Sequence, residues 1–142
     1  MPIKNYTTKV SAAQTMGEIQ GILAAHGARK VMMDFSETGE AEAVTFALML
    51  NGSLVGFRLT AKPEGVIRIM KQDGQNCTPE QATRIAWRNI KDWIAAQIAL
   101  VETEQASMQE LFLPYLVISQ KDAPPQTLYE KFENSQYMLP EA

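Results

Sequence analysis

The stretch AVTFALMLNGSLVGFRLT, residues 43–60, decides the fold of this chain. Two runs in which apolar residues alternate flank the dipeptide Asn51-Gly52. Asn-Gly in that setting is the strongest short-range signal for a β-hairpin, because both residues tolerate a positive φ. A two-residue loop fixes the register, and the facing pairs are then Leu50 with Ser53, Leu48 with Val55, Phe46 with Phe57, and Val44 with Leu59.

The two faces of this hairpin differ in chemistry. With the exception of Ser53, the register above puts apolar side chains on one face, which we expect to be the core face. The opposite face pairs Met49 with Leu54, Ala47 with Gly56 and Thr45 with Arg58. It is small and smooth, with one arginine.

Hydrophobic periodicity and capping signals predict the elements around the hairpin. Ser11, Thr78, Ser107 and Thr127 each precede a Gln or Glu by three residues, which is a capping-box pattern. We expect strands at 3–10 and 29–35, helices at 12–26, 63–72, 79–104, from 107 to before Pro114 and 127–134, extended chain at 115–118, and a loop at 121–126 that contains Pro124 and Pro125.

The resulting order is β-α-β-β-β followed by helices. It predicts an α+β fold: an antiparallel sheet packed by helices on one face, with a long C-terminal helix and a short helical cap. The length of 142 residues indicates a single domain. We expect a sheet-and-helix part at 1–75, a helical part at 76–134 and a tail at 135–142.

The composition is that of an ordinary globular domain. Hydrophobic residues make up 46% and charged residues 20% of the chain, which excludes disorder and collagen-like repeats by composition. One cysteine, Cys77, allows no intrachain disulfide and suits a reducing compartment. No apolar run approaches the roughly 20 residues of a membrane span, and residues 1–10 lack an apolar signal core. We expect a cytoplasmic protein without membrane contact.

Signatures of catalysis and of cofactor binding are absent from the sequence. Neither GxxxxGK nor GxGxxG occurs, and one histidine with one cysteine cannot build a zinc site. His26 is expected to end a helix, and Cys77 to be an inert loop thiol. The acidic residues Asp34, Glu37, Glu40 and Glu42 match no calcium-loop spacing and indicate a solvated turn. The sequence therefore predicts no enzyme, no cofactor and no metal.

Charge is distributed unevenly along the chain, whose formal net charge is -3. Residues 1–57 carry four basic and five acidic residues, net -1. Residues 58–91 carry seven basic and three acidic residues, net +4, and residues 92–142 carry two basic and eight acidic residues, net -6. The net charge of the whole chain argues against a polyanion partner, but the positive net charge of residues 58–91 does not.

A basic stripe lies within the predicted long helix. Arg84, Arg88 and Lys91 follow one another at i, i+4 and i+7 and share a helix face. Trp87 lies at the border of that face, where an indole could stack a base while the cations hold phosphates. We expect Arg58, Arg68 and Lys71 to extend the patch.

Other interpretations of the stripe stay open. It can be an ordinary solvated face, with Trp87 in the core. It can instead pair with the acidic residues Glu102, Glu104, Glu130 and Glu133, or with a second copy of the chain. The smooth hairpin face formed by Ala43, Thr45, Ala47 and Gly56 would accept close packing by such a copy, so a homodimer is a further hypothesis.

Four stretches carry a family resemblance: Asn5-Tyr6-Thr7-Thr8-Lys9, Trp87-Arg88-Asn89-Ile90-Lys91-Asp92-Trp93, Phe112-Leu113-Pro114-Tyr115 and Thr127-Leu128-Tyr129-Glu130. With them the chain resembles an uncharacterised family of small proteins from bacteriophages and mobile elements of Firmicutes. The order α-β-β-β-α over residues 12–72 is also similar to that of double-stranded-RNA-binding and single-strand-annealing domains. Pro63-Glu64-Gly65 stands where the former have a Lys-rich helix start.

The resemblance implies a genomic context and no particular activity. Our first hypothesis is a non-enzymatic accessory protein that binds nucleic acid, in single-stranded form, through Arg84, Trp87, Arg88 and Lys91. The alternatives are an anti-defence factor that binds a host protein or sequesters a nucleotide, and a structural or regulatory homodimer without a ligand.

Overall fold

A three-stranded antiparallel sheet forms the centre of the protein, whose computed structural model describes residues 2–134. Its strands are β1 (Lys30–Phe35), β2 (Ala41–Leu50) and β3 (Ser53–Thr60), in the order β1-β2-β3. Asn51 and Gly52 have φ values of 52° and 84°, as the predicted hairpin turn requires. The predicted register is confirmed at every pair from Leu50↔Ser53 to Val44↔Leu59.

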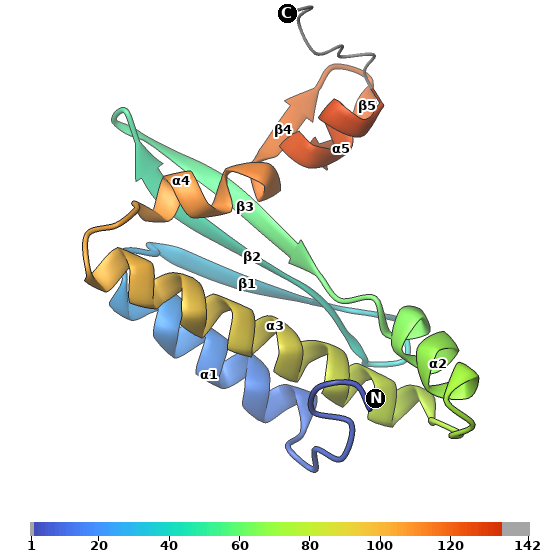
Figure 1. The fold of residues 1–142 in the computed structure, drawn as a ribbon. Coiled ribbons are helices and arrows are strands. Elements are labelled where there is room, and N and C mark those ends of the chain that lie inside the picture. The colour runs from blue at the N-terminus through green and yellow to red at the C-terminus, as the bar shows by residue number, and fades with distance from the viewer. Residues whose placement is uncertain (1, 135–142) are drawn as a thin grey trace, which may run out of the picture.

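Two helices lie side by side along one face of this sheet (Figure 1). They are α1 (Ala12–Ala25) and α3 (Pro79–Glu102), and α2 (Pro63–Gln72) packs against α3 near its beginning. The chain then continues through α4 (Met108–Phe112), the 3-10 helix η1 (Leu113–Tyr115), β4 (Val117–Gln120), β5 (Ala123–Thr127) and α5 (Leu128–Glu133). The α+β class predicted from the sequence is confirmed.

The core lies between the sheet and the helices. Phe46 of β2 stacks on Phe57 of β3, with ring centroids 5.4 Å apart. Phe112 of α4 meets Phe46 edge-on at 5.2 Å and Trp93 of α3 at 5.5 Å. Because these rings come from distant parts of the sequence, their packing joins the hairpin to the helices and to α4.

The strand predicted at residues 3–10 is wrong. These residues form turns, in which Thr8 N–H donates to the Asn5 carbonyl at 3.0 Å. Asn5 has a φ of 66°, which an extended strand does not allow. The segment lies against α3, where the Gln81 side-chain amide donates to the carbonyls of Tyr6 and Thr8 at 3.2 and 2.9 Å. Helix side chains therefore take the place of a neighbouring strand.

The loop predicted at residues 121–126 is also wrong, because β5 pairs there with β4. Proline cannot donate a ladder hydrogen bond, which argues against a strand in the sequence. Pro124 and Pro125 fall where the register shifts, between the pairs Ile118↔Gln126 and Gln120↔Ala123. The part 76–134, predicted as helical, thus contains a strand pair as well. The predicted tail, 135–142, lies outside the described residues.

Helix ends follow the predicted capping signals. Ser107 with Glu110 and Thr127 with Glu130 form reciprocal capping boxes, and Thr78 accepts from the Gln81 backbone N–H at 3.1 Å. None of the helices within residues 2–134 is both long enough and apolar enough to cross a membrane.

Candidate nucleic-acid interface

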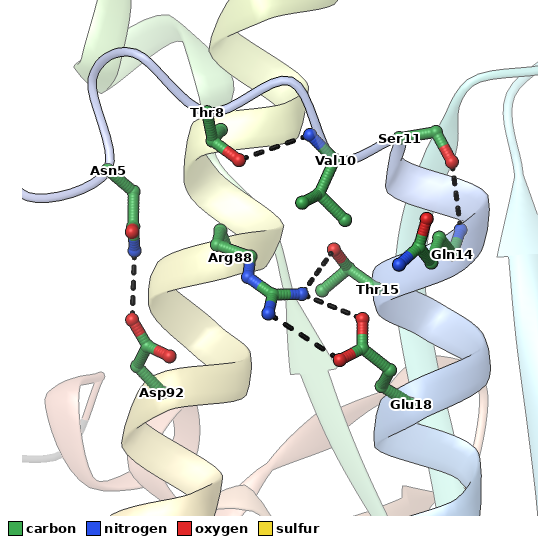
Figure 2. Close-up of polar contacts among 9 residues, drawn as sticks. All are labelled: Asn5, Thr8, Val10, Ser11, Gln14, Thr15, Glu18, Arg88 and Asp92. Carbon is green, nitrogen blue, oxygen red and sulfur yellow. Dashed lines mark hydrogen bonds and ion pairs between the residues drawn. The ribbon is translucent and has the colours of Figure 1, made fainter.

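Arg88, at the centre of the predicted basic stripe, is bound to α1. Its Nη1 donates to Glu18 Oε2 at 2.7 Å and to Thr15 Oγ1 at 3.3 Å, while Nη2 lies 3.5 Å from Glu18 Oε1 (Figure 2). The Arg88 side chain is 20% exposed. This hydrogen bond lowers the pKa of Glu18 and raises that of Arg88. Arg88 therefore links α3 to α1, whether or not it also contacts a ligand.

Trp87 belongs to the core, so its predicted base-stacking role is wrong. Its side chain is 0% exposed, and the indole Nε1–H donates to the Ala41 carbonyl at 3.1 Å. The buried positions Thr83, Ala86 and Ile94 lie on the same broad side of α3. The buried face of α3 is thus wider than the sequence pattern indicates, and it includes Trp87.

The N-terminal segment contacts α3 beside the stripe. The Asn5 amide donates to Asn89 Oδ1 at 2.8 Å and to Asp92 Oδ2 at 2.9 Å, and Lys4 Nζ lies 3.5 Å from the same Asp92 oxygen. The hydrogen bond from Asn5, and then the Lys4 charge, lower the pKa of Asp92. Figure 2 shows Asn5 reaching toward Asp92 on α3.

The carboxylates beside the stripe are therefore not the four glutamates proposed from the sequence. Glu18 of α1 and Asp92 of α3 surround it, and Lys91 lowers the pKa of both. Among the residues described, no ion pair joins Arg84, Arg88 or Lys91 to any of the four glutamates proposed from the sequence, which are Glu102, Glu104, Glu130 and Glu133.

The other predicted site residues divide between two places. Arg68 and Lys71 are exposed on α2, which packs against α3. Arg58 lies on the outer face of β3 and pairs with Asp34 of β1. Since β2 is the central strand, this ion pair spans the outer face of β2. The structure thus separates Arg58 from the stripe, to which the sequence assigns it.

The smooth hairpin face is partly covered, which corrects the expectation that it is free for a second copy. Ala43 is fully buried beside Asp34, and a side chain at Gly56 would touch Val117 of β4. Thr45 and Ala47 are half-buried.

Five cations of residues 58–91 have no carboxylate within 4 Å among the residues that the structure describes. We call them the unpaired cations: Lys62, Arg68, Lys71, Arg84 and Lys91. Arg84 has only a neutral partner, since its Nε donates to Gln81 Oε1 at 2.8 Å. Arg84 belongs to the second turn of α3, at the end of the molecule where α2 lies (Figure 1).

A groove lies on the opposite side of the sheet. It has a volume of about 690 Å³ and is bordered by the outer sheet face and by β5 and α5. Arg58 and Lys62 line it together with Tyr129 and Glu130. The sequence does not mark this groove, because its walls come together only when β5, which the sequence misses, pairs with β4.

The remaining candidate residues have local partners. His26 Nδ1 lies 2.8 Å from the Ile22 carbonyl at the end of α1, and Cys77 is half-buried, with a pKa raised by burial. Within residues 2–134, no three His, Cys, Asp or Glu side chains are grouped as a metal site requires.

Comparisons with known proteins yield no relative: no family model, no curated protein and no solved structure matches this chain.

Proposed function

We propose that the chain is a non-enzymatic accessory protein of a mobile genetic element that binds nucleic acid. The observation that supports this proposal is the set of five unpaired cations. Their region, residues 58–91, has seven basic residues and a net charge of +4. Within residues 2–134, carboxylates pair with only two of these seven residues, Arg58 and Arg88. Lysine and arginine without carboxylate partners are the groups that contact phosphates and release counterions.

The contact surface in this proposal differs from the one expected from the sequence. Arg68, Lys71 and Arg84 form its centre, because α2 and the first turns of α3 lie at one end of the molecule (Figure 1). Arg88 and Trp87 support it indirectly, by holding α3 against α1 and the sheet. Binding through phosphates alone is largely independent of base sequence.

The test is fluorescence anisotropy with labelled single-stranded and double-stranded oligonucleotides of mixed sequence. We expect the triple variant Arg68→Gln/Lys71→Gln/Arg84→Gln to weaken binding at least tenfold. Arg29→Gln is the matched control, since Arg29 is exposed and directly precedes β1, whose beginning lies at the other end of the sheet from α2 (Figure 1). An oligonucleotide affinity that the triple variant and the control change equally would refute the proposed surface.

A protein partner is a second candidate, favoured by an exposed apolar pair at the hairpin end. Met49 and Leu54 face each other across β2 and β3 and are 41% and 45% exposed. Contiguous apolar surface of this kind is typical of protein interfaces. In light scattering at rising concentration, the homodimer version predicts a dimer mass that Leu54→Lys reduces to that of a monomer. A constant monomer mass for the unsubstituted protein would exclude it.

A further inference from the structure

The groove on the outer sheet face has a floor and a wall of different origin. Its floor includes Met32, Thr45 and Arg58, which are neighbours in register across β1, β2 and β3. Its wall includes Gln126 of β5 and Tyr129 of α5. A volume of about 690 Å³ falls within the range of about 300–1,000 Å³ that small-molecule sites occupy.

The acidic groups of the groove already have partners. Glu130 Oε1 accepts from the Thr127 backbone N–H at 2.9 Å, and that bond, with the nearby charges of Lys62 and Arg58, holds the pKa of Glu130 below its ordinary value. Glu133 accepts from the Tyr129 hydroxyl, which raises the pKa of Tyr129. These carboxylates keep acceptor capacity toward a ligand hydroxyl or amine.

The donors of the groove are less occupied. Lys62 has no carboxylate within 4 Å among the described residues, and Arg58 uses only Nη1 toward Asp34. The hydroxyls of Thr45 and Thr60 make no hydrogen bond within the described part of the chain. A guanidinium with free N–H groups and an ammonium that line the same groove are groups that can bind a phosphate.

Flat and apolar surface lies next to these donors. Tyr129 is 55% exposed and Met32 is 57% exposed, and both line the groove. An exposed tyrosine ring offers a stacking face to a planar ring, whichever base that ring belongs to.

We propose that this groove binds a nucleoside phosphate, with its phosphate at Lys62 and Arg58 and its base on Tyr129. Glu133 and Glu130 accept from the hydroxyls of the sugar. The same chemistry is offered by a free nucleotide and by the phosphorylated end of a strand. The proposal goes beyond the cationic surface centred on Arg68, Lys71 and Arg84, because it concerns the other face of the sheet. Lys62 is the one unpaired cation that lines the groove.

The probes are AMP, adenosine and a short oligonucleotide with either a 5′-phosphate or a 5′-hydroxyl. Each is titrated into the ¹⁵N-labelled protein, and the amide signals of Thr45, Thr60 and Gln126 are followed. We expect AMP, or the 5′-phosphorylated oligonucleotide alone, to shift these signals, and adenosine to bind at least fivefold more weakly than AMP. Shifts with AMP identify a free nucleotide, and shifts with only the phosphorylated strand identify a strand end.

Two variants and one control test the assigned roles. Lys62→Gln should weaken AMP binding at least fivefold and leave adenosine unchanged, while Tyr129→Leu should weaken both. Lys62 and Tyr129 are both exposed, so their substitution should not unfold the protein. The control is Lys121→Gln, because Lys121 is exposed and does not line the groove. The proposal fails if neither phosphate probe shifts the groove amides, or if Lys62→Gln acts like the control. The triple variant on α2 and α3 leaves these shifts in place, so the two proposals fail separately.

Discussion

Trp87 shows how one residue at a helix border changes the interpretation of a surface. Its indole is 0% exposed and donates to the Ala41 carbonyl at 3.1 Å. We expect Trp87→Phe to lower the free energy of unfolding by about 1–3 kcal/mol, because the ring is smaller and the hydrogen bond from the indole is lost. Urea unfolding measures the loss.

The same variant separates a core role from a binding role. Oligonucleotide affinity, measured by anisotropy under conditions in which the variant is folded, should stay within twofold of the unsubstituted protein. If Trp87→Phe lowered the oligonucleotide affinity and left the free energy of unfolding unchanged, Trp87 would have a role in binding after all.

The ion pair between Arg88 and Glu18 predicts a pH dependence. The hydrogen bond from Arg88 lowers the pKa of Glu18 in the folded state below its ordinary value of 4.5. A carboxylate whose folded pKa is lowered stabilises the fold fully above its unfolded pKa, and this contribution is lost as the pH falls through the folded pKa. The melting temperature should therefore fall below about pH 4.5, and Glu18→Gln should make that fall shallower.

The matched control for this pH profile is Glu102→Gln, an exposed carboxylate at the end of α3. Near neutral pH we expect Glu18→Gln to lower the melting temperature by a few degrees and the control to leave it nearly unchanged. Two profiles that run parallel from neutral to acidic pH would show that the pair contributes nothing.

At the scale of elements, the hairpin turn carries the register of the sheet. Gly52 has a φ of 84° with open space around it, so a side chain there strains only the backbone. We expect Gly52→Ala to destabilise the protein by about 1 kcal/mol in urea unfolding.

At Gly17 we expect the same substitution, glycine to alanine, to have the opposite effect. It lies in α1, where an added methyl group meets no atom within 4 Å. Gly17→Ala should therefore stabilise the protein by about 0.5–1 kcal/mol. If both substitutions changed the free energy of unfolding equally, backbone conformation would not explain their effects.

Elements were predictable from the sequence where local chemistry and periodicity agree. The hairpin is such a case, because Asn51-Gly52 and the alternation on both sides select one register. The segment 3–10 and β5 are the opposite case. The first is held by side chains of α3, and the second tolerates Pro124 and Pro125 because its register shifts there. Both depend on partners distant in sequence, which a local pattern does not contain.

At the scale of the whole molecule, the basic character of the candidate site was predictable but its partners were not. The sequence shows the surplus of cations in residues 58–91. It does not show that Glu18, from the first helix, pairs with Arg88, nor that Asp34 pairs with Arg58. These pairs follow from the packing of α1 on α3 and from the strand order. The groove beside β5 depends likewise on tertiary structure.

The charge that remains unpaired sets the salt dependence expected of nucleic-acid binding. If the four unpaired cations outside the groove contact phosphates, the logarithm of the affinity for a single strand falls with the logarithm of salt concentration with a slope of about -2.8. Arg68→Gln/Lys71→Gln should reduce that slope by about 1.4, and Arg29→Gln should leave it unchanged. Anisotropy titrations over a range of salt concentrations measure this slope.

Arg88→Ala should act differently, because Arg88 is paired with Glu18. It should lower the melting temperature while reducing the slope by less than either α2 substitution. A slope near zero in the unsubstituted protein would exclude phosphate contacts as the source of affinity, and a slope reduced most by Arg88→Ala would restore the stripe on α3 as the contact surface.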